Sequence, residues 1–197
     1  MTRVLAFAGS ARRDSLNKKL ARAAARYARE AGAEATFVDL DDYPIPIYHG
    51  DLEAASGMPE NATKLRELFL AHDALLIASP ENNSSITALL KNTIDWLSRD
   101  VGDGKGDSSG LAPWRGKVAG LMAASPGAFG GVRALPHLRQ VLSTLDVTVL
   151  GTQVAVPRAH EAFAADGSIA DERVAKSVRA LAGAVAEASR RLAAAAG

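Results

Sequence analysis

Short apolar runs alternate along this chain with stretches whose apolar residues recur at helical spacing, and this alternation limits the possible folds. Three runs, at residues 4–8, 74–78 and 118–123, are apolar throughout, and each is followed by a loop and a helical pattern. Strands that are covered by helices on both faces carry such continuous runs. Two shorter runs, at 35–38 and 147–150, bring the expected strands to five. The sequence therefore predicts an α/β fold with a doubly wound parallel sheet.

We expect the strand order 2-1-3-4-5 of flavodoxin-like sheets, with helices on both faces of the five-stranded sheet. The fourth strand is expected at about 117–123. Pro136 predicts the first turn of a helix or a kink. Four further helices are expected. The first ends before Gly32, the second starts near Pro59, the third buries Leu90, Ile94 and Leu97, and the last covers about 171–195. We expect residues 1–197 to form a single flavodoxin-like domain.

Composition excludes several kinds of function. The chain has 197 residues, a formal net charge of +1 and no cysteine, so disulfides and thiolate metal sites are excluded. A charge this small argues against a nucleic-acid partner or an acidic membrane surface. No apolar run approaches the roughly 18 residues that cross a bilayer. We expect a cytoplasmic protein with no nucleic-acid partner, no membrane partner and no metal.

Three polar loops follow predicted strands, at residues 9–17, 79–85 and 125–131. In open parallel sheets, ligands bind in the crevice outside the carboxyl ends of the strands. Because the first and third strands lie on either side of the expected switch point, their loops should border the same crevice. The three loops therefore predict one binding site.

The first loop has the chemistry of a phosphate site. Ser10, Ser15 and Asn17 supply hydroxyl and amide donors, and Arg12 supplies a charged fork at the start of a helix. The alternative is that Ser15 only caps the helix. A dinucleotide fingerprint would need glycine at positions 9, 11 and 14, where only Gly9 fits. Without those glycines, Asp39 is interpreted as a strand-end or capping residue.

The second and third loops suit a flat ring with polar edges. Glu81 has two interpretations, a general acid or base, or a brace for the following helix. Gly127 and its neighbours Gly130 and Gly131 permit positive φ or a close backbone approach. The alternative for the third loop is a tight connection between the strand and the following helix that binds no ligand. In the helix after the second loop we expect a Lys91–Asp95 pair and a core position for Trp96.

Several segments together resemble the NADPH-dependent FMN reductase family, a flavodoxin-like group that includes chromate and quinone reductases and azoreductase relatives. The resemblance rests on residues 9–17, 80–84, 90–99, 130–133 and 137–142. It implies bound FMN, with NADPH or NADH as hydride donor and a small-molecule acceptor such as a quinone, chromate, an azo compound or free flavin. It also implies a homodimer or homotetramer with the flavin near the subunit interface.

The resemblance further implies that the chemistry is flavin-borne, with no catalytic side chain. The implied cofactor-binding residues are Ser10, Arg12, Ser15, Leu16, Asn17, Pro80, Glu81, Asn82, Asn83, Ser84, Ser125 and Gly127. Relatives usually carry tyrosine at position 82 and proline at position 87, where this chain has Asn82 and Thr87. The loss of that tyrosine removes an aromatic contact to the flavin, worth about 0.5–1.5 kcal/mol.

Two other function classes compete with a reductase. A non-enzymatic flavodoxin-like electron carrier would oxidise little NADPH alone, and such carriers usually have a strongly acidic surface, which +1 does not fit. A flavin-free binding module would be colourless. The four histidines, His49, His72, His137 and His160, are expected in helices or irregular loops without nucleophile neighbours, so no catalytic triad is predicted. Four arginines are candidates for the 2′-phosphate of NADPH, and the sequence does not rank them: Arg13, Arg99, Arg115 and Arg133.

Two long irregular stretches remain, at 41–58 and 99–115. Loops of this length are usually functional or disordered. The first is interpreted as a wall of the site or a subunit contact, and the second as a mobile flap. The alternative for both is a plain surface loop.

Overall fold

A computed structural model describes residues 1–101 and 109–195 and contains a five-stranded, all-parallel sheet. Its order is β2-β1-β3-β4-β5, as predicted. The strands are β1 (Arg3–Ala8), β2 (Glu34–Val38), β3 (Ala74–Ala78), β4 (Val118–Ala124) and β5 (Thr148–Val156). β3 has the bounds expected from its apolar run. Every residue of β3 and β4 is buried, because helices cover both faces of the central strands.

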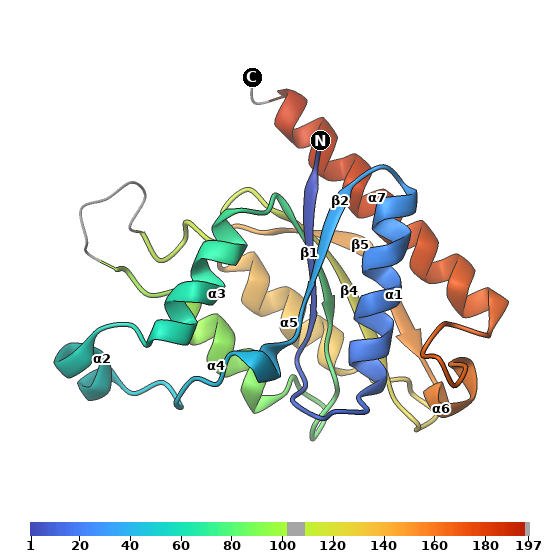
Figure 1. The fold of residues 1–197 in the computed structure, drawn as a ribbon, viewed down its shortest axis with the longest axis horizontal. Coiled ribbons are helices and arrows are strands. Elements are labelled where there is room, and N and C mark those ends of the chain that lie inside the picture. The colour runs from blue at the N-terminus through green and yellow to red at the C-terminus, as the bar shows by residue number, and fades with distance from the viewer. Residues whose placement is uncertain (102–108, 196–197) are drawn as a thin grey trace.

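Helices pack on both faces of the sheet (Figure 1). One face carries α1 (Leu16–Glu30) and α7 (Glu172–Ala195), and the other carries α3 (Glu60–Leu70), α4 (Ala88–Leu97) and α5 (Ala134–Ser143). Pro136 lies in the first turn of α5, where a proline breaks no helical hydrogen bond. Three short elements were not expected: a 3₁₀ turn at Leu40–Asp42, α2 (Gly50–Ser56) and α6 (Ala159–Ala162). Asp39 caps the 3₁₀ turn, since its Oδ1 accepts from the Asp41 N–H at 3.2 Å.

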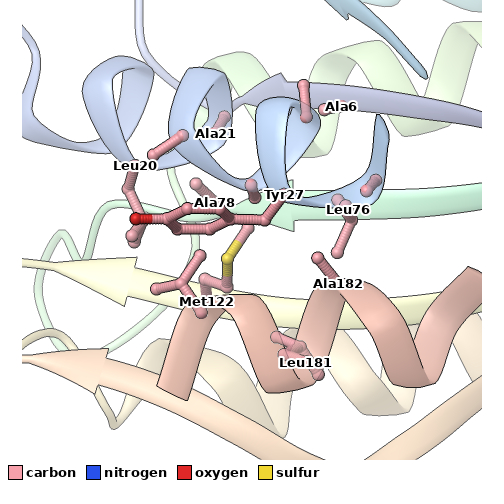
Figure 2. Packing of buried hydrophobic residues seen from close by; sticks show 14 of the residues in the cluster. Ala6, Leu20, Ala21, Tyr27, Leu76, Ala78, Met122, Leu181 and Ala182 are labelled. Atoms are coloured by element: carbon pink, nitrogen blue, oxygen red, sulfur yellow. The ribbon is translucent and has the colours of Figure 1, made fainter. Parts of the chain in front are cut away.

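The sheet divides the core into two clusters, one on each face. Figure 2 shows the cluster between the sheet, α1 and α7, where the ring of Tyr27 lies beside Leu20 and above Met122. The opposite cluster contains Phe69, whose ring lies 5.3 Å from that of Phe7 and 4.9 Å from that of Trp114. The expected core position of Trp96 is confirmed, since its side chain is fully buried there. The filled core fixes the strand ends that carry the site.

The fifth strand is longer than the run at 147–150 predicted, because β5 continues to Val156. It pairs only with β4, at the edge of the sheet, and its register shifts opposite Ala119–Leu121. An edge strand is partly solvated, so polar residues such as Thr152 and Gln153 do not end it. The extension brings the end of β5 beside the third loop.

The stretch 41–58 packs on α4. The Asn92 side chain accepts from the Tyr48 N–H at 2.8 Å and donates to the Pro46 carbonyl at 2.9 Å. Trp96 Nε1 donates to the same carbonyl at 2.8 Å. For the stretch 99–115, the expected flap falls mainly on residues 102–108, which lie outside the described residues. In the part of the chain that is described, no helix is long and apolar enough to span a membrane.

Candidate functional site

The three predicted loops border one cleft of about 590 Å³ at the carboxyl ends of β1, β3 and β4. This volume lies within the range of small-molecule and cofactor sites. Nine of the twelve predicted site residues line it: Ser10, Arg12, Ser15, Leu16, Asn17, Pro80, Glu81, Asn82 and Ser125. Asn83, Ser84 and Gly127 are not among the lining residues. Nine further residues, which were not predicted to bind the cofactor, also line the cleft: Gly9, Ala11, Asp14, Thr87, Ala88, Leu89, Ala124, Pro126 and His160.

The first loop presents hydrogen-bond donors at the amino end of α1. Ser15 is the N-cap, and its Oγ accepts from the Lys18 N–H at 3.3 Å. Among the described residues, no hydrogen bond engages the backbone N–H groups of Leu16 and Asn17. Unpaired N–H groups and the helix dipole together attract an anion. Ser15 therefore caps the helix and also leaves its hydroxyl proton for a ligand.

Ser10 and Arg12 complete this end of the cleft. Ser10 is buried, and its Oγ accepts from the Arg12 N–H at 3.3 Å, so the Ser10 hydroxyl can still donate a hydrogen bond to a ligand. Arg12 is exposed at the cleft lining, where its guanidinium has no ion pair in the described structure. The donor set is that of a phosphate site. The residues present thus fit the phosphate of FMN.

Asn17 links the first loop to the end of β4. Its Oδ1 accepts from the Ala124 N–H at 2.9 Å, and its Nδ2 donates to the Ala124 carbonyl at 2.8 Å. Asn17 and Ala124 are both buried. The residue therefore holds the strand end that leads into Ser125, in addition to lining the cleft. The sequence identified Asn17 only as a ligand donor, because its partner lies 107 residues away.

Thr87 links the first loop to α4. Its Oγ1 donates to the Gly9 carbonyl at 2.7 Å and accepts from the Leu90 N–H at 3.1 Å as the N-cap of the helix. The amino ends of α1 and α4 therefore both border the cleft, and both dipoles favour negative charge there. The position of a threonine just before a predicted helix was the available sequence signal.

Glu81 links the second loop to the start of α5. Its carboxylate accepts from the Arg133 N–H at 2.9 Å and from Arg133 Nε at 2.7 Å, with a further contact to Nη2. Burial alone would raise the pKa of Glu81, but the hydrogen bonds and charge of Arg133 outweigh it and hold this pKa below its ordinary value. A carboxylate held in this way is a poor general base. Glu81 braces α5, not the following helix α4 as the sequence suggested.

A tight two-residue turn explains why Asn83 and Ser84 lie outside the lining. Asn82 and Ser85 exchange two backbone hydrogen bonds of 3.0 Å, and the residues between them have φ of 51° and 64°. Positive φ at both central positions is the pattern of a type I′ turn. The two residues form the tip of this turn, while Asn82 at its base lines the cleft.

In the third loop the glycines serve close packing. Gly130 and Gly131 have φ of 61° and 81°, as the sequence predicted for positive φ. A Cβ at Gly130 would lie 2.7 Å from Pro157 N, so no side chain fits. Gly127 has no positive φ, and its N–H donates to Ser125 Oγ at 3.1 Å.

One histidine does have a hydroxyl neighbour, so the expectation of isolated histidines was wrong at this position. His137 Nδ1 lies 2.9 Å from Ser85 Oγ. Both residues line a separate groove between α4 and α5, not the cleft. His160, from the unexpected helix α6, lines the cleft instead. No group of histidine, aspartate and glutamate side chains within the described ranges is arranged to hold a metal ion.

The sheet order and the cleft at its carboxyl edge define a flavodoxin-like protein. Residues 2–161 match the model of the NADPH-dependent FMN reductase family, and the chain belongs to that family. An NAD(P)H-dependent FMN reductase of Pseudomonas aeruginosa is 37% identical over 90% of this chain and 89% of its own length. A 2-hydroxy-1,4-benzoquinone reductase of a Burkholderia species is 34% identical, covering 85% of each chain.

Solved structures show the same relationship. The flavoenzyme FerB of Paracoccus denitrificans, an NAD(P)H:(acceptor) oxidoreductase, superimposes with a TM-score of 0.80. It is 30% identical, and the match covers 97% of this chain and 98% of that chain. An archaeal flavodoxin matches with a TM-score of 0.60 at 9% identity, over 96% of this chain and 99% of its own, which supports the fold alone.

Proposed function

We propose that this protein is an FMN-dependent oxidoreductase that takes hydride from NADPH or NADH and reduces a small-molecule acceptor, with a quinone as the favoured class. The names of its relatives support the reaction class, since they include FMN and quinone reductases. The observation that most supports this function is the phosphate end of the cleft. There, hydrogen-bond donors without a partner in the described structure come together from Ser10, Arg12, Ser15 and the first turn of α1. These donors suit a terminal phosphate.

The residues of the chain bind the cofactor and orient it. Ser10, Arg12 and Ser15 hold the phosphate, and the second and third loops border the ring through Pro80, Asn82 and Ser125. When bound, FMN supplies the hydride chemistry that none of the amino-acid side chains provides. Glu81 stays ionised and paired with Arg133, so its part is to fix the position of the second loop. The amino ends of α1 and α4 stabilise negative charge in the cleft.

The first test is the absorbance spectrum of the purified protein before and after anaerobic addition of NADPH. Visible flavin bands that bleach on NADPH are the expected result. Bands that persist would favour the electron carrier instead. A protein that stays colourless after FMN is added and the excess removed would favour the flavin-free module.

A second test addresses the phosphate end directly. Arg12→Ala should weaken FMN by about 1.5–3 kcal/mol, or roughly 10- to 150-fold, because a charge-assisted hydrogen bond is lost. Arg190→Ala, an exposed arginine of α7, is the control. Equal FMN dissociation constants for the two variants in a fluorescence titration would contradict the assignment of Arg12.

The family resemblance also supports a single FMN-binding domain over residues 1–197 and a homodimer or homotetramer in the cytoplasm. Light scattering of the purified protein measures the assembly, and fractionation of cells measures its location. A monomer at micromolar concentration would contradict the predicted assembly.

A further inference from the structure

A further cavity, of about 470 Å³, lies between α1 and the loop 165–168. We call it the α1 groove. It shares Asp14 and Ser15 with the cofactor cleft, so the two cavities meet at the phosphate end of the cleft. Five basic side chains line the groove: Arg13, Lys18, Lys19, Arg22 and Arg26. Only two carboxylates, Asp14 and Asp166, line it as well. In a chain with a net charge of +1, this is a marked local excess of positive charge.

Three of the five basic groups are already paired. Lys18 Nζ lies 2.7 Å from Asp39 Oδ1, and Arg22 Nη2 lies 3.5 Å from the second oxygen of the same carboxylate. Arg26 Nε lies 3.9 Å from Glu30 Oε1. In the described parts of the chain, the side chains of Arg13 and Lys19 make no ion pair or hydrogen bond. These two charges are therefore available to an anion in the groove.

The two carboxylates that line the groove make no ion pair with Arg13 or Lys19 in the described parts of the chain. Asp166 Oδ1 is occupied by Ser168, whose N–H donates at 2.9 Å and whose Oγ donates at 2.7 Å. Asp14 lies where the groove meets the cleft. The consecutive residues Arg12 and Arg13 line different cavities, the first the cleft and the second the groove. One loop thus supplies a cation to each of two adjoining sites.

The ion pairs distinguish the four arginines that were candidates for the 2′-phosphate of NADPH. Arg99 Nε contacts both oxygens of the Glu53 carboxylate, at 2.9 and 3.1 Å. Arg133 is held by Glu81. Arg115 Nε lies 3.9 Å from an oxygen of Asp146. Arg13 lies in a cavity that adjoins the cofactor cleft, and within the described residues its side chain makes no ion pair or hydrogen bond.

We propose that the α1 groove binds the 2′-phosphate of NADPH through Arg13 and Lys19, and that it makes this donor preferred over NADH. The proposal rests on the proposed function. A phosphomonoester carries a charge of about −1.5 to −2 near neutral pH, and a guanidinium can bind it with two parallel hydrogen bonds. NADH lacks this phosphate, so it gains nothing from the groove.

The test compares Arg13→Ala/Lys19→Ala with the charge-matched control Arg190→Ala/Arg191→Ala. The control arginines are exposed on the last turns of α7. In Figure 1 this end of α7 lies toward the amino ends of the strands, whereas the cleft is lined by residues at their carboxyl ends. For the groove variant, kcat/KM with NADPH should fall about tenfold or more, on the scale of one charge-assisted hydrogen bond. With NADH it should stay unchanged, and the control should retain the wild-type ratio of the two donors.

Calorimetric titration of the flavin-loaded protein with 2′,5′-ADP gives a readout independent of turnover. Wild type should bind 2′,5′-ADP more tightly than 5′-AMP, and the groove variant should lose that difference. Equal losses with NADPH and NADH, or unchanged discrimination between the two nucleotides, would overturn the proposal. A third outcome would also overturn the proposal: the groove variant binds FAD more weakly, but its ratio of kcat/KM with NADPH to kcat/KM with NADH is unchanged. The groove would then hold the second phosphate of FAD.

The outcome separates this proposal from the proposed function. If the wild-type protein oxidises both nicotinamide donors and the groove variant shows no change in their ratio, only the groove assignment fails. If wild type oxidises neither donor, the proposed function fails. The titration with 2′,5′-ADP still decides whether the groove binds the phosphate.

Discussion

Removal of the Asn17 side chain should destabilise the protein and disturb the third wall of the cleft. The side chain makes two hydrogen bonds to the backbone of Ala124, at 2.9 and 2.8 Å, and both residues are buried. Asn17→Ala leaves one N–H and one C=O without partners. Each unsatisfied buried group costs about 1–3 kcal/mol, so the free energy of unfolding should fall by about 2–5 kcal/mol.

The measurement is urea unfolding at a fixed FMN concentration, because a bound ligand adds to the apparent stability. An unchanged slope with a lower midpoint shows lost stability, not an altered unfolded state. The matching thermal shift is roughly 5–15 °C for a chain of this size. FMN affinity should fall as well, since Ser125 follows Ala124 directly.

Asn61→Ala is the matched control. Its Nδ2 donates one hydrogen bond of 2.9 Å to the Pro44 carbonyl at an exposed position, so the expected loss is below about 1 kcal/mol. Equal losses for the two variants would show that water satisfies the Ala124 groups when Asn17 is truncated. Asn17 would then not be needed to hold the end of β4 against the first loop.

Three smaller changes test other contacts of the cleft. Thr87→Ala removes the N-cap of α4 and should cost about 1–2 kcal/mol in urea unfolding, and a loss within error would contradict the cap. Arg133 holds the pKa of Glu81 below 4.5, so their stabilisation is complete above that value and is lost as pH falls through the folded pKa. Glu81→Gln should therefore reduce the acid-induced fall in melting temperature, and curves of equal slope would count against the pair. Asn82→Tyr should tighten FMN up to about tenfold if an aromatic contact is gained, and equal or weaker binding in a titration would discard that idea.

The central strands were predictable because burial on both faces leaves a clear sequence pattern. The run at 74–78 became β3 without a change in bounds. β5 was underestimated, since an edge strand tolerates Thr152 and Gln153. The short helix α2 was missed because none of its seven residues is buried, so its sequence carries no apolar stripe.

The site was predictable where ligand chemistry follows a strand end directly. All five residues predicted in the first loop line the cleft. The turn at Asn82–Ser85 was not predictable, because its backbone geometry places Asn83 and Ser84 at the tip without a glycine to signal positive φ. Contacts between residues far apart in the chain leave no local pattern either. Glu81 and Arg133 are separated by 52 positions, and His160 reaches the cleft from a helix of four residues.

Three side chains link the segments that border the cleft, and these links explain how a cleft made of loops keeps its shape. Thr87 joins the start of α4 to the first loop through the Gly9 carbonyl, Asn17 joins the first loop to the end of β4, and Glu81 joins the second loop to the start of α5 through Arg133. A proline at position 87 would have no hydroxyl and could not make the first link. Because the start of α4 and the end of β4 both hold the first loop, the donors at the phosphate end are oriented before a ligand arrives, and binding need not order them.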